Sequence, residues 1–124
     1  LAEPLLLGAG RLGLRAILAA SGLPPRVAAP YLRALGTREA LAGALAWYRA
    51  NGLSVCDLPP VAVPSILAWG ERDPALGPEA ARRCGEHVTG PYRLAVLPRA
   101  GHWLPELHAP ALTPLLTGWI AQHP

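Results

Sequence analysis

Two polar side chains lie a few residues after apolar segments and could act together on a proton. Asp73 follows residues 64–69 (PSILAW), and His102, 29 positions after it, follows residues 92–97 (YRLAVL). If both segments are neighbouring strands, their ends bring a carboxylate next to an imidazole. The carboxylate can then hold one ring nitrogen while the other takes up a proton. This is the acid–base half of a nucleophile–His–acid triad.

The segments around this pair predict a mixed α/β structure with two parallel strands. Residues 64–69 are a continuous apolar run, which is typical of a buried strand. Pro78 and Glu79 predict the start of a helix that continues to about His87, and residues 92–97 predict the second strand. Strands joined by a helix are expected to lie parallel in one sheet. A sheet of two strands leaves its edge and apolar faces uncovered, so we expect further neighbours.

A last helix is expected after the His102 loop, and two prolines bear on the choice of its start. It should end near Gln122. A start at Pro110 conflicts with Pro114, because a proline inside a helix removes a hydrogen bond. The pattern favours Thr113 as the N-cap and Pro114 as the first helical residue.

The two halves of the chain differ in pattern, which predicts two domains. Residues 1–58 carry helical periodicity, whereas residues 59–124 alternate between strand and helix patterns. Consecutive prolines within residues 57–60 indicate a linker between them.

The first half predicts three helices. Residues 13–21 place apolar side chains on one face. The prolines at 24 and 25 could open a second helix, although Pro30 would break its middle. Residues 37–51 form the strongest pattern, with Thr37 as a plausible N-cap.

Three motifs, taken together, resemble the C-terminal part of an α/β-hydrolase. Residues 63–76 (VPSILAWGERDPAL) are similar to the family's strand and acid loop, and residues 100–106 (AGHWLPE) are similar to its histidine loop. Residues 44–50 (ALAWYRA) resemble the cap-domain signature of the epoxide hydrolase branch. The resemblance implies that residues 1–58 are a helical cap remnant and that residues 59–124 contain the last two strands of the core.

The resemblance also implies roles for single residues. His102 would activate water, and Asp73 would orient it and stabilise its charge. Tyr48 would donate a hydrogen bond to the epoxide oxygen, since an alkoxide leaves poorly without one. Trp47 and Trp103 would line the substrate site. A carboxylate nucleophile would attack the epoxide carbon, and the His102-activated water would hydrolyse the resulting ester.

The chain departs from this family at the nucleophile. No Gly-x-Ser-x-Gly or Gly-x-Asp-x-Gly elbow occurs. The available serines and aspartates are Ser21, Ser54, Ser65, Asp57 and Asp73. We therefore expect a fragment or truncated product that begins at Leu1 and has no hydrolase activity by itself.

Other interpretations stay open at this point. A serine esterase or a dehalogenase could use the same scaffold, and the missing nucleophile would decide between them. A non-catalytic remnant that binds a partner is the alternative outside enzymes. At single positions, Asp73 could be an ordinary turn aspartate before Pro74 with Glu71 as a competing acid, His102 could cap a loop, and Tyr48 could be a core aromatic.

Cofactor and metal sites are not expected. Residues 8–13 match G-x-G-x-x-G, but a dinucleotide site also needs a preceding strand and a later acid. Glu106 and His108 lie near His102 without a metal-binding spacing. Cys56 and Cys84 predict free thiols.

The resemblance implies a small apolar substrate, such as an epoxide or ester, and composition argues against two other kinds of partner. The net charge is +3, and all 11 basic residues are scattered arginines, so nucleic-acid binding is not expected. No apolar run approaches the roughly 18–20 residues that span a bilayer. We expect a cytoplasmic protein that could self-associate through its exposed sheet edge.

Overall fold

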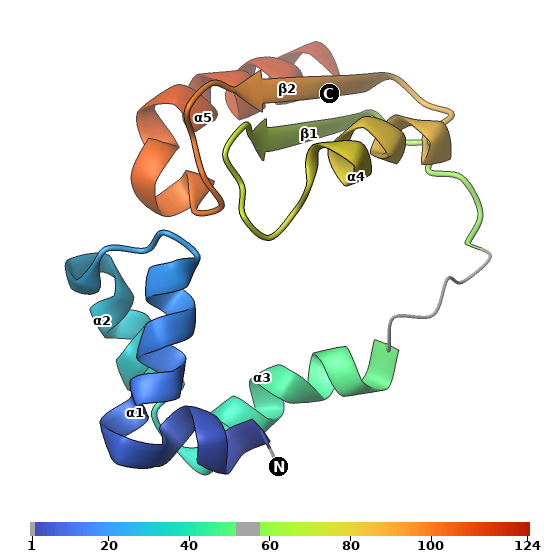
Figure 1. Cartoon of the computed structure of the whole chain (residues 1–124). Coiled ribbons are helices and arrows are strands. Elements are labelled where there is room, and N and C mark those ends of the chain that lie inside the picture. The colour runs from blue at the N-terminus through green and yellow to red at the C-terminus, as the bar shows by residue number, and fades with distance from the viewer. Residues whose placement is uncertain (1, 52–57) are drawn as a thin grey trace. The chain divides into compact units, whose positions relative to one another are not determined.

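The computed structural model describes residues 2–51 and 58–124 and divides the chain into two compact units. The units are Leu1–Asp57 and Leu58–Pro124, and a grey trace marks residues 1 and 52–57 (Figure 1). The linker expected at residues 57–60 and the thiol of Cys56 fall partly or wholly outside the described residues. That the first unit is a cap stays a prediction.

Three helices make up the first unit: α1 (Ala2–Ala20), α2 (Pro25–Ala34) and α3 (Arg38–Asn51). Thr37 is the N-cap of α3, because its Oγ1 accepts a hydrogen bond from the Ala40 amide at 3.2 Å. Apolar side chains from all three helices and the α1–α2 turn form the core of this unit. They are Leu14, Leu18, Leu23, Ala28 and Leu41.

The expected helix over residues 13–21 is only part of α1, which starts at Ala2 and kinks at residues 8–11. Ala9, Gly10 and Arg11 have φ values of 47°, 71° and 67°, in the left-handed region. Gly10 adopts this conformation without steric cost. Arg11 is held there by a hydrogen bond from its Nη1 to the Leu32 carbonyl at 2.9 Å. The G-x-G-x-x-G match therefore follows a helix and not the strand that a dinucleotide site requires.

The prediction that Pro30 breaks the second helix is wrong. Helix α2 continues from Pro25 to Ala34 with Pro30 inside it. Pro25 lies in the first turn, where a proline has no hydrogen bond to lose. Pro30 removes one backbone hydrogen bond, and the helix nevertheless continues to Ala34 and packs against α1 with Ala28 buried.

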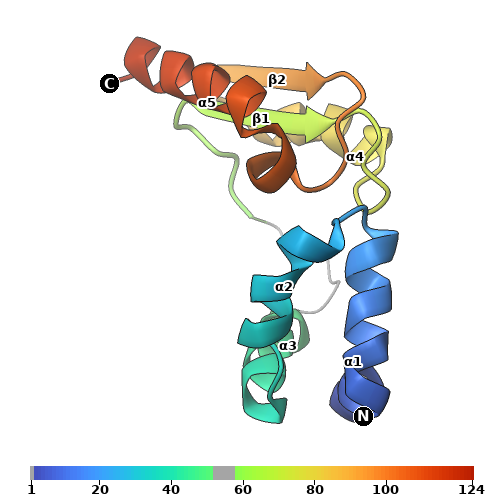
Figure 2. The same ribbon diagram turned by 90° about the vertical axis from the view of Figure 1, so that its left-hand side faces the viewer.

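The second unit confirms the predicted α/β class, with two parallel strands and flanking helices. Strand β1 (Ser65–Gly70) pairs with β2 (Tyr92–Leu97), from Ser65 opposite Tyr92 to Gly70 opposite Leu97. Between them lie α4 (Pro78–Arg83) and the 3₁₀ helix η1 (Cys84–His87), so the predicted helix tightens in its last turn. Helix α5 (Leu104–Gln122) follows β2. Figures 1 and 2 show α4 on one face of the sheet and α5 on the other.

The expectation that β1 is a buried strand holds only at its end. Trp69 and Gly70 are buried, and the four residues before them are half-buried. No third strand flanks the sheet within the described residues. The main cluster lies between the sheet and α5. It contains Leu97, Ala100 and Leu104, with Ala68, Leu112 and Leu115 packed against them.

The predicted start of the last helix at Thr113 and Pro114 is also wrong. Helix α5 begins at Leu104 and contains both internal prolines. His108 leaves helical geometry (φ −131°, ψ 21°), and this kink two residues before Pro110 relieves the proline's clash with the preceding turn. The helical pattern therefore continues across a residue that sequence rules treat as a stop.

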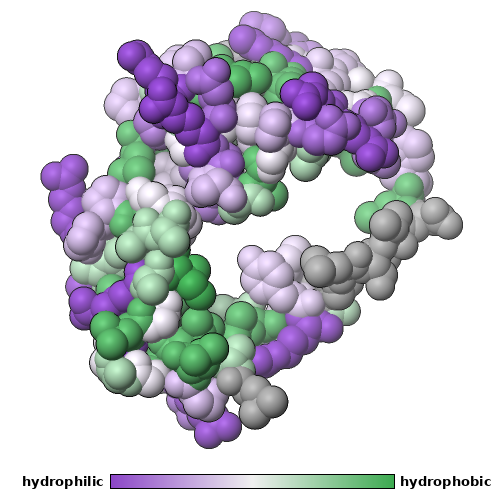
Figure 3. Space-filling view, in the orientation of Figure 1, coloured by the Kyte–Doolittle hydropathy of each residue, from purple (hydrophilic) through white to green (hydrophobic). Residues whose placement is uncertain are grey.

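Hydrophobic side chains are exposed on both units. Over α1 they form patches on the face seen in Figure 3, and Leu5 and Leu12 of this helix are 77% and 61% exposed. Among the described helices, none is both long and apolar enough to cross a membrane.

Candidate active site

Parallel pairing brings the ends of β1 and β2 to the same edge of the sheet, and two loops leave from there. Backbone hydrogen bonds join these loops: the Glu71 amide donates to the Leu97 carbonyl at 3.1 Å, and the Arg72 amide donates to the Ala100 carbonyl at 2.8 Å. The Glu71 carboxylate also accepts the Arg99 amide at 3.0 Å. Three contacts thus fix the acid loop to the histidine loop.

The close approach of the loops depends on the absence of a side chain at Gly70. A Cβ at this position would overlap the Gly101 carbonyl oxygen and lie 2.7 Å from that of Ala100. Since real Cβ atoms do not come so close to oxygen, any other residue at 70 would separate the two loops.

Asp73 and His102 meet at this edge, as their spacing predicted. The Nδ1 of His102 lies 2.9 Å from Oδ2 and 3.2 Å from Oδ1 of Asp73. The Asp73 side chain is 5% exposed, whereas that of His102 is 36% exposed. A shielded carboxylate therefore holds an imidazole that solvent can reach.

The Asp73 carboxylate also organises its own loop. Its Oδ1 accepts the amides of Ala75 and Leu76 at 2.7 and 2.9 Å. The indole Nε1 of Trp69 donates to the Leu76 carbonyl at 2.9 Å and closes the loop from the strand side. The turn-aspartate interpretation and the triad-acid interpretation are therefore compatible, because one carboxylate makes both sets of contacts.

These contacts keep Asp73 ionised. Burial raises its pKa, but hydrogen bonds from Leu76, His102 and Ala75 more than offset burial, and the pKa lies below its ordinary value. An ionised carboxylate accepts a proton-bearing Nδ1, which leaves Nε2 as the ring nitrogen with a free lone pair. The pair is thus arranged for general base catalysis at Nε2.

The other residues near this pair do not compete for His102. Glu71, the alternative acid, is bound to the Arg99 amide instead. The ring of Trp103 contacts that of His102 edge-on, with centroids 5.6 Å apart. Across residues 2–51 and 58–124, no group of three or more His, Cys, Asp or Glu side chains could hold a metal ion.

Tyr48 and Trp47 lie near the end of α3 in the first unit. They are 66% and 67% exposed, and their rings meet edge-on with centroids 5.2 Å apart. Tyr48 is therefore not the core aromatic that helical spacing alone would suggest. Its neighbour Arg49 binds Glu3 at 2.6 Å. Because His102 belongs to the other unit, the expectation that Tyr48 and His102 act on one substrate stays a prediction.

Trp69, Gly70 and Glu71 position the pair; Trp69 and Gly70 were not predicted as site residues, and Glu71 was predicted only as a competing acid. All three lie in the segment that the sequence singled out for Asp73. A signal was available for Gly70, since a glycine at a strand end allows a close backbone approach. The partners of Trp69 and Glu71 are main-chain groups, which no residue pattern reveals.

Comparisons with known proteins find sequence similarity to part of two epoxide hydrolases. No family profile matches the sequence. The chain is 37% identical over 91 residues to epoxide hydrolase A of Mycobacterium tuberculosis, covering 66% of this chain and 28% of that protein. It is 32% identical over 90 residues to epoxide hydrolase 3 of Mus musculus, covering 70% of this chain and 24% of that protein.

One solved structure is similar to this chain in fold but not in sequence. ClbQ from the colibactin NRPS/PKS pathway superposes with a TM-score of 0.51 and 16% sequence identity, covering 82% of this chain and 48% of ClbQ. The chain therefore spans about a quarter of the curated relatives and about half of this structure.

Proposed function

The chain is homologous to part of the epoxide hydrolases, enzymes of the α/β-hydrolase fold, and on this premise we propose that His102 and Asp73 are the base and acid of an epoxide hydrolase reaction. One observation carries the proposal. The buried Asp73 carboxylate lies 2.9 Å from Nδ1 of the accessible His102, at the end of two paired strands.

The proposed reaction has two steps. A carboxylate supplied from outside these 124 residues attacks an epoxide carbon, and the carbon–oxygen bond breaks as Tyr48 hydrogen-bonds and protonates the departing oxygen. Water then attacks the ester carbonyl while Nε2 of His102 takes its proton. The ester bond breaks as the imidazolium returns its proton to the departing diol oxygen, and the proton of the regenerated carboxyl group restores the Tyr48 hydroxyl, so that the diol and the carboxylate are released. Asp73 stabilises the imidazolium that forms in between.

The substrate proposed is a small apolar epoxide. Trp103 beside His102 and the exposed Trp47 beside Tyr48 offer aromatic surfaces to such a molecule. A serine esterase or a dehalogenase would use the same base–acid pair with another nucleophile. The names of the relatives favour the epoxide over these two.

A chimera tests the proposal. In it, this chain replaces the part of Mycobacterium tuberculosis epoxide hydrolase A that it matches, and hydrolysis of styrene oxide is measured. We expect turnover that falls about 10³-fold or more in His102→Gln and Asp73→Asn. The control variants His108→Gln and Glu79→Gln, which make the same kinds of substitution elsewhere, should retain this turnover. An active chimera whose turnover is unchanged by His102→Gln would refute the proposal that His102 is the base.

A further inference from the structure

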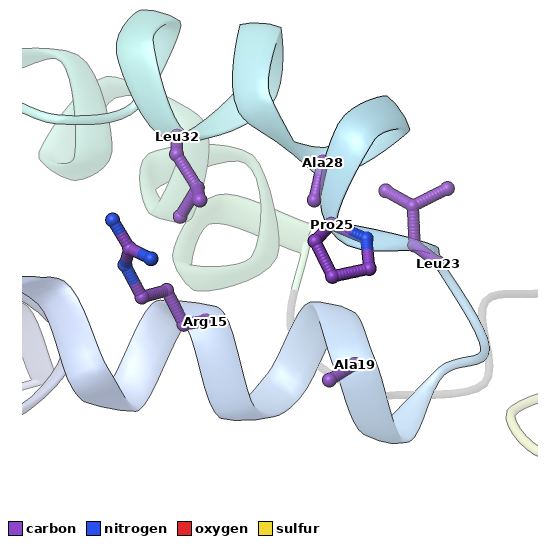
Figure 4. Close-up of a pocket in the computed structure, with 6 residues that line it drawn as sticks. All are labelled: Arg15, Ala19, Leu23, Pro25, Ala28 and Leu32. Carbon is purple, nitrogen blue, oxygen red and sulfur yellow. The ribbon is translucent and has the colours of Figure 1, made fainter.

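The first unit contains a pocket that the proposed reaction does not use. It lies between α1 and α2 and has a volume of about 160 Å³. Its walls are Ala19 of α1, Leu23 of the turn, and Pro25, Ala28 and Leu32 of α2, with Arg15 at one end (Figure 4). Leu23 and Ala28 are only 2% and 5% exposed, so the floor belongs to the core of the unit.

The size of the pocket sets the size of its occupant. A cavity of about 150 Å³ with apolar walls binds a benzene ring. The apolar part of the ligand is therefore one ring or a branched chain of similar volume.

The charge of the pocket sets the polarity of its occupant. Arg15 is the only charged residue among the described residues that line it. Its side chain points from α1 towards α2, on the side of Leu32 (Figure 4). The guanidinium of Arg11 donates to the Leu32 carbonyl at 2.9 Å and adds positive charge at the same residue.

The surrounding unit strengthens this preference for an anion. Residues 2–51 contain six arginines and two glutamates, whereas residues 58–124 contain five arginines and five acids. One of the two glutamates, Glu3, is already paired with Arg49. A guanidinium in such surroundings binds a carboxylate with two parallel hydrogen bonds.

We propose that this pocket binds a small monocarboxylate of about the size of benzoate, with the carboxylate on Arg15 and the ring on Ala19, Ala28 and Leu32. None of the residues of this pocket belongs to the His102–Asp73 pair, and binding requires no catalytic step.

Equilibrium dialysis of the full chain against radiolabelled benzoate tests the site. Three competitors separate the contributions: benzyl alcohol keeps the ring, acetate keeps the charge, and benzylamine reverses the charge. We expect benzoate to bind at least about tenfold more tightly than each of them, because one charge-assisted contact and one apolar contact are both required. Equal binding of benzoate and benzyl alcohol would refute a role for Arg15.

Variants locate the site. Arg15→Gln should weaken benzoate binding about tenfold or more, down to the level of benzyl alcohol. Ala19→Leu should abolish binding of both molecules by filling the pocket, and the exposed position of Ala19 makes this change compatible with folding. Arg26→Gln, at an exposed position of α2 outside the pocket, is the control. Equal losses in Arg15→Gln and Arg26→Gln would mean general attraction to a basic surface and would overturn the proposal.

Discussion

At the scale of single residues, the geometry of the site depends on the hydrogen bonds of two carboxylates, those of Asp73 and Glu71. Asp73 holds His102 and also accepts two amides of its own loop. Glu71, two positions earlier, binds the main chain of the other loop. The sequence alone indicated Asp73 and His102. Each follows a predicted strand, and loops that follow neighbouring parallel strands leave the same edge of the sheet. The sequence left Asp73 and Glu71 as competitors, since the choice between them depends on side-chain direction.

Glu71 should stabilise the contact between the two loops. Replacing it with alanine removes the acceptor of the Arg99 amide, and we expect a loss of about 1 kcal/mol in the free energy of unfolding, because Glu71 is exposed to solvent. Glu71→Gln keeps an acceptor oxygen and should therefore retain most of the free energy of unfolding that Glu71→Ala loses. Urea titration measures both variants, and amide exchange at Arg99 should be faster only in Glu71→Ala. Unchanged exchange there would contradict the assignment.

Glu3 should make the stability of the first unit depend on pH. Its hydrogen bond and ion pair with Arg49 lower its pKa from 4.5 to about 2. Because the folded state has the lower pKa, the contribution is fully present above pH 4.5 and is lost as the pH falls to about 2.

The variant Glu3→Gln isolates this effect. The difference in free energy of unfolding between wild type and Glu3→Gln should be largest at neutral pH and should shrink towards zero near pH 2. Denaturant titrations at several pH values measure it. A difference that stays constant over this range would show that Glu3 acts through packing and not through its charge.

At the scale of elements, the site depends on how two strand ends approach each other. The alternation of strand and helix patterns was enough to predict β1, α4 and β2 and their parallel pairing. It failed at prolines, because α2 and α5 both continue through residues that break isolated helices. Tertiary packing and the kink at His108 determine whether these two helices continue past their prolines, and periodicity predicts neither of them.

Gly70 is the position at the strand ends where an added side chain should disturb the structure most. We expect Gly70→Ala to lower the free energy of unfolding by about 2 kcal/mol or more, because its Cβ would overlap carbonyl oxygens of the histidine loop. Gly77→Ala is the matched control, since no atom lies within 4 Å of a Cβ there. Its effect should stay within about 0.5 kcal/mol. Equal losses in urea titrations of the two variants would contradict this role of Gly70.

At the scale of the whole chain, the described core is small and much apolar surface is exposed. Most residues of β1 are half-buried, and β2 mixes exposed, half-buried and buried residues. Val63, Leu76 and Val96 are 65%, 53% and 47% exposed. Such a surface favours association. We expect purified chain to form dimers or larger species in a concentration-dependent way, which sedimentation velocity measures. A monomer at all concentrations would contradict this.

The isolated chain should lack hydrolase turnover. His102 and Asp73 can polarise water, but the 124 residues contain no nucleophile elbow, and triad members act as a unit. Assays with aryl epoxides and p-nitrophenyl esters, with His102→Ala as the control, measure this directly. Turnover that disappears in His102→Ala would mean that a residue within the chain serves as the nucleophile.

The assignment of His102 as the base that hydrolyses an ester is tested most directly by trapping that ester. In the chimera with epoxide hydrolase A, His102→Gln should still open styrene oxide but should hydrolyse the ester at least about 10³-fold more slowly. Mass spectrometry of the intact protein should then show one covalently bound substrate per chain, formed more slowly when Tyr48→Phe is added. An active chimera whose His102→Gln variant accumulates no adduct and turns over normally would contradict the account.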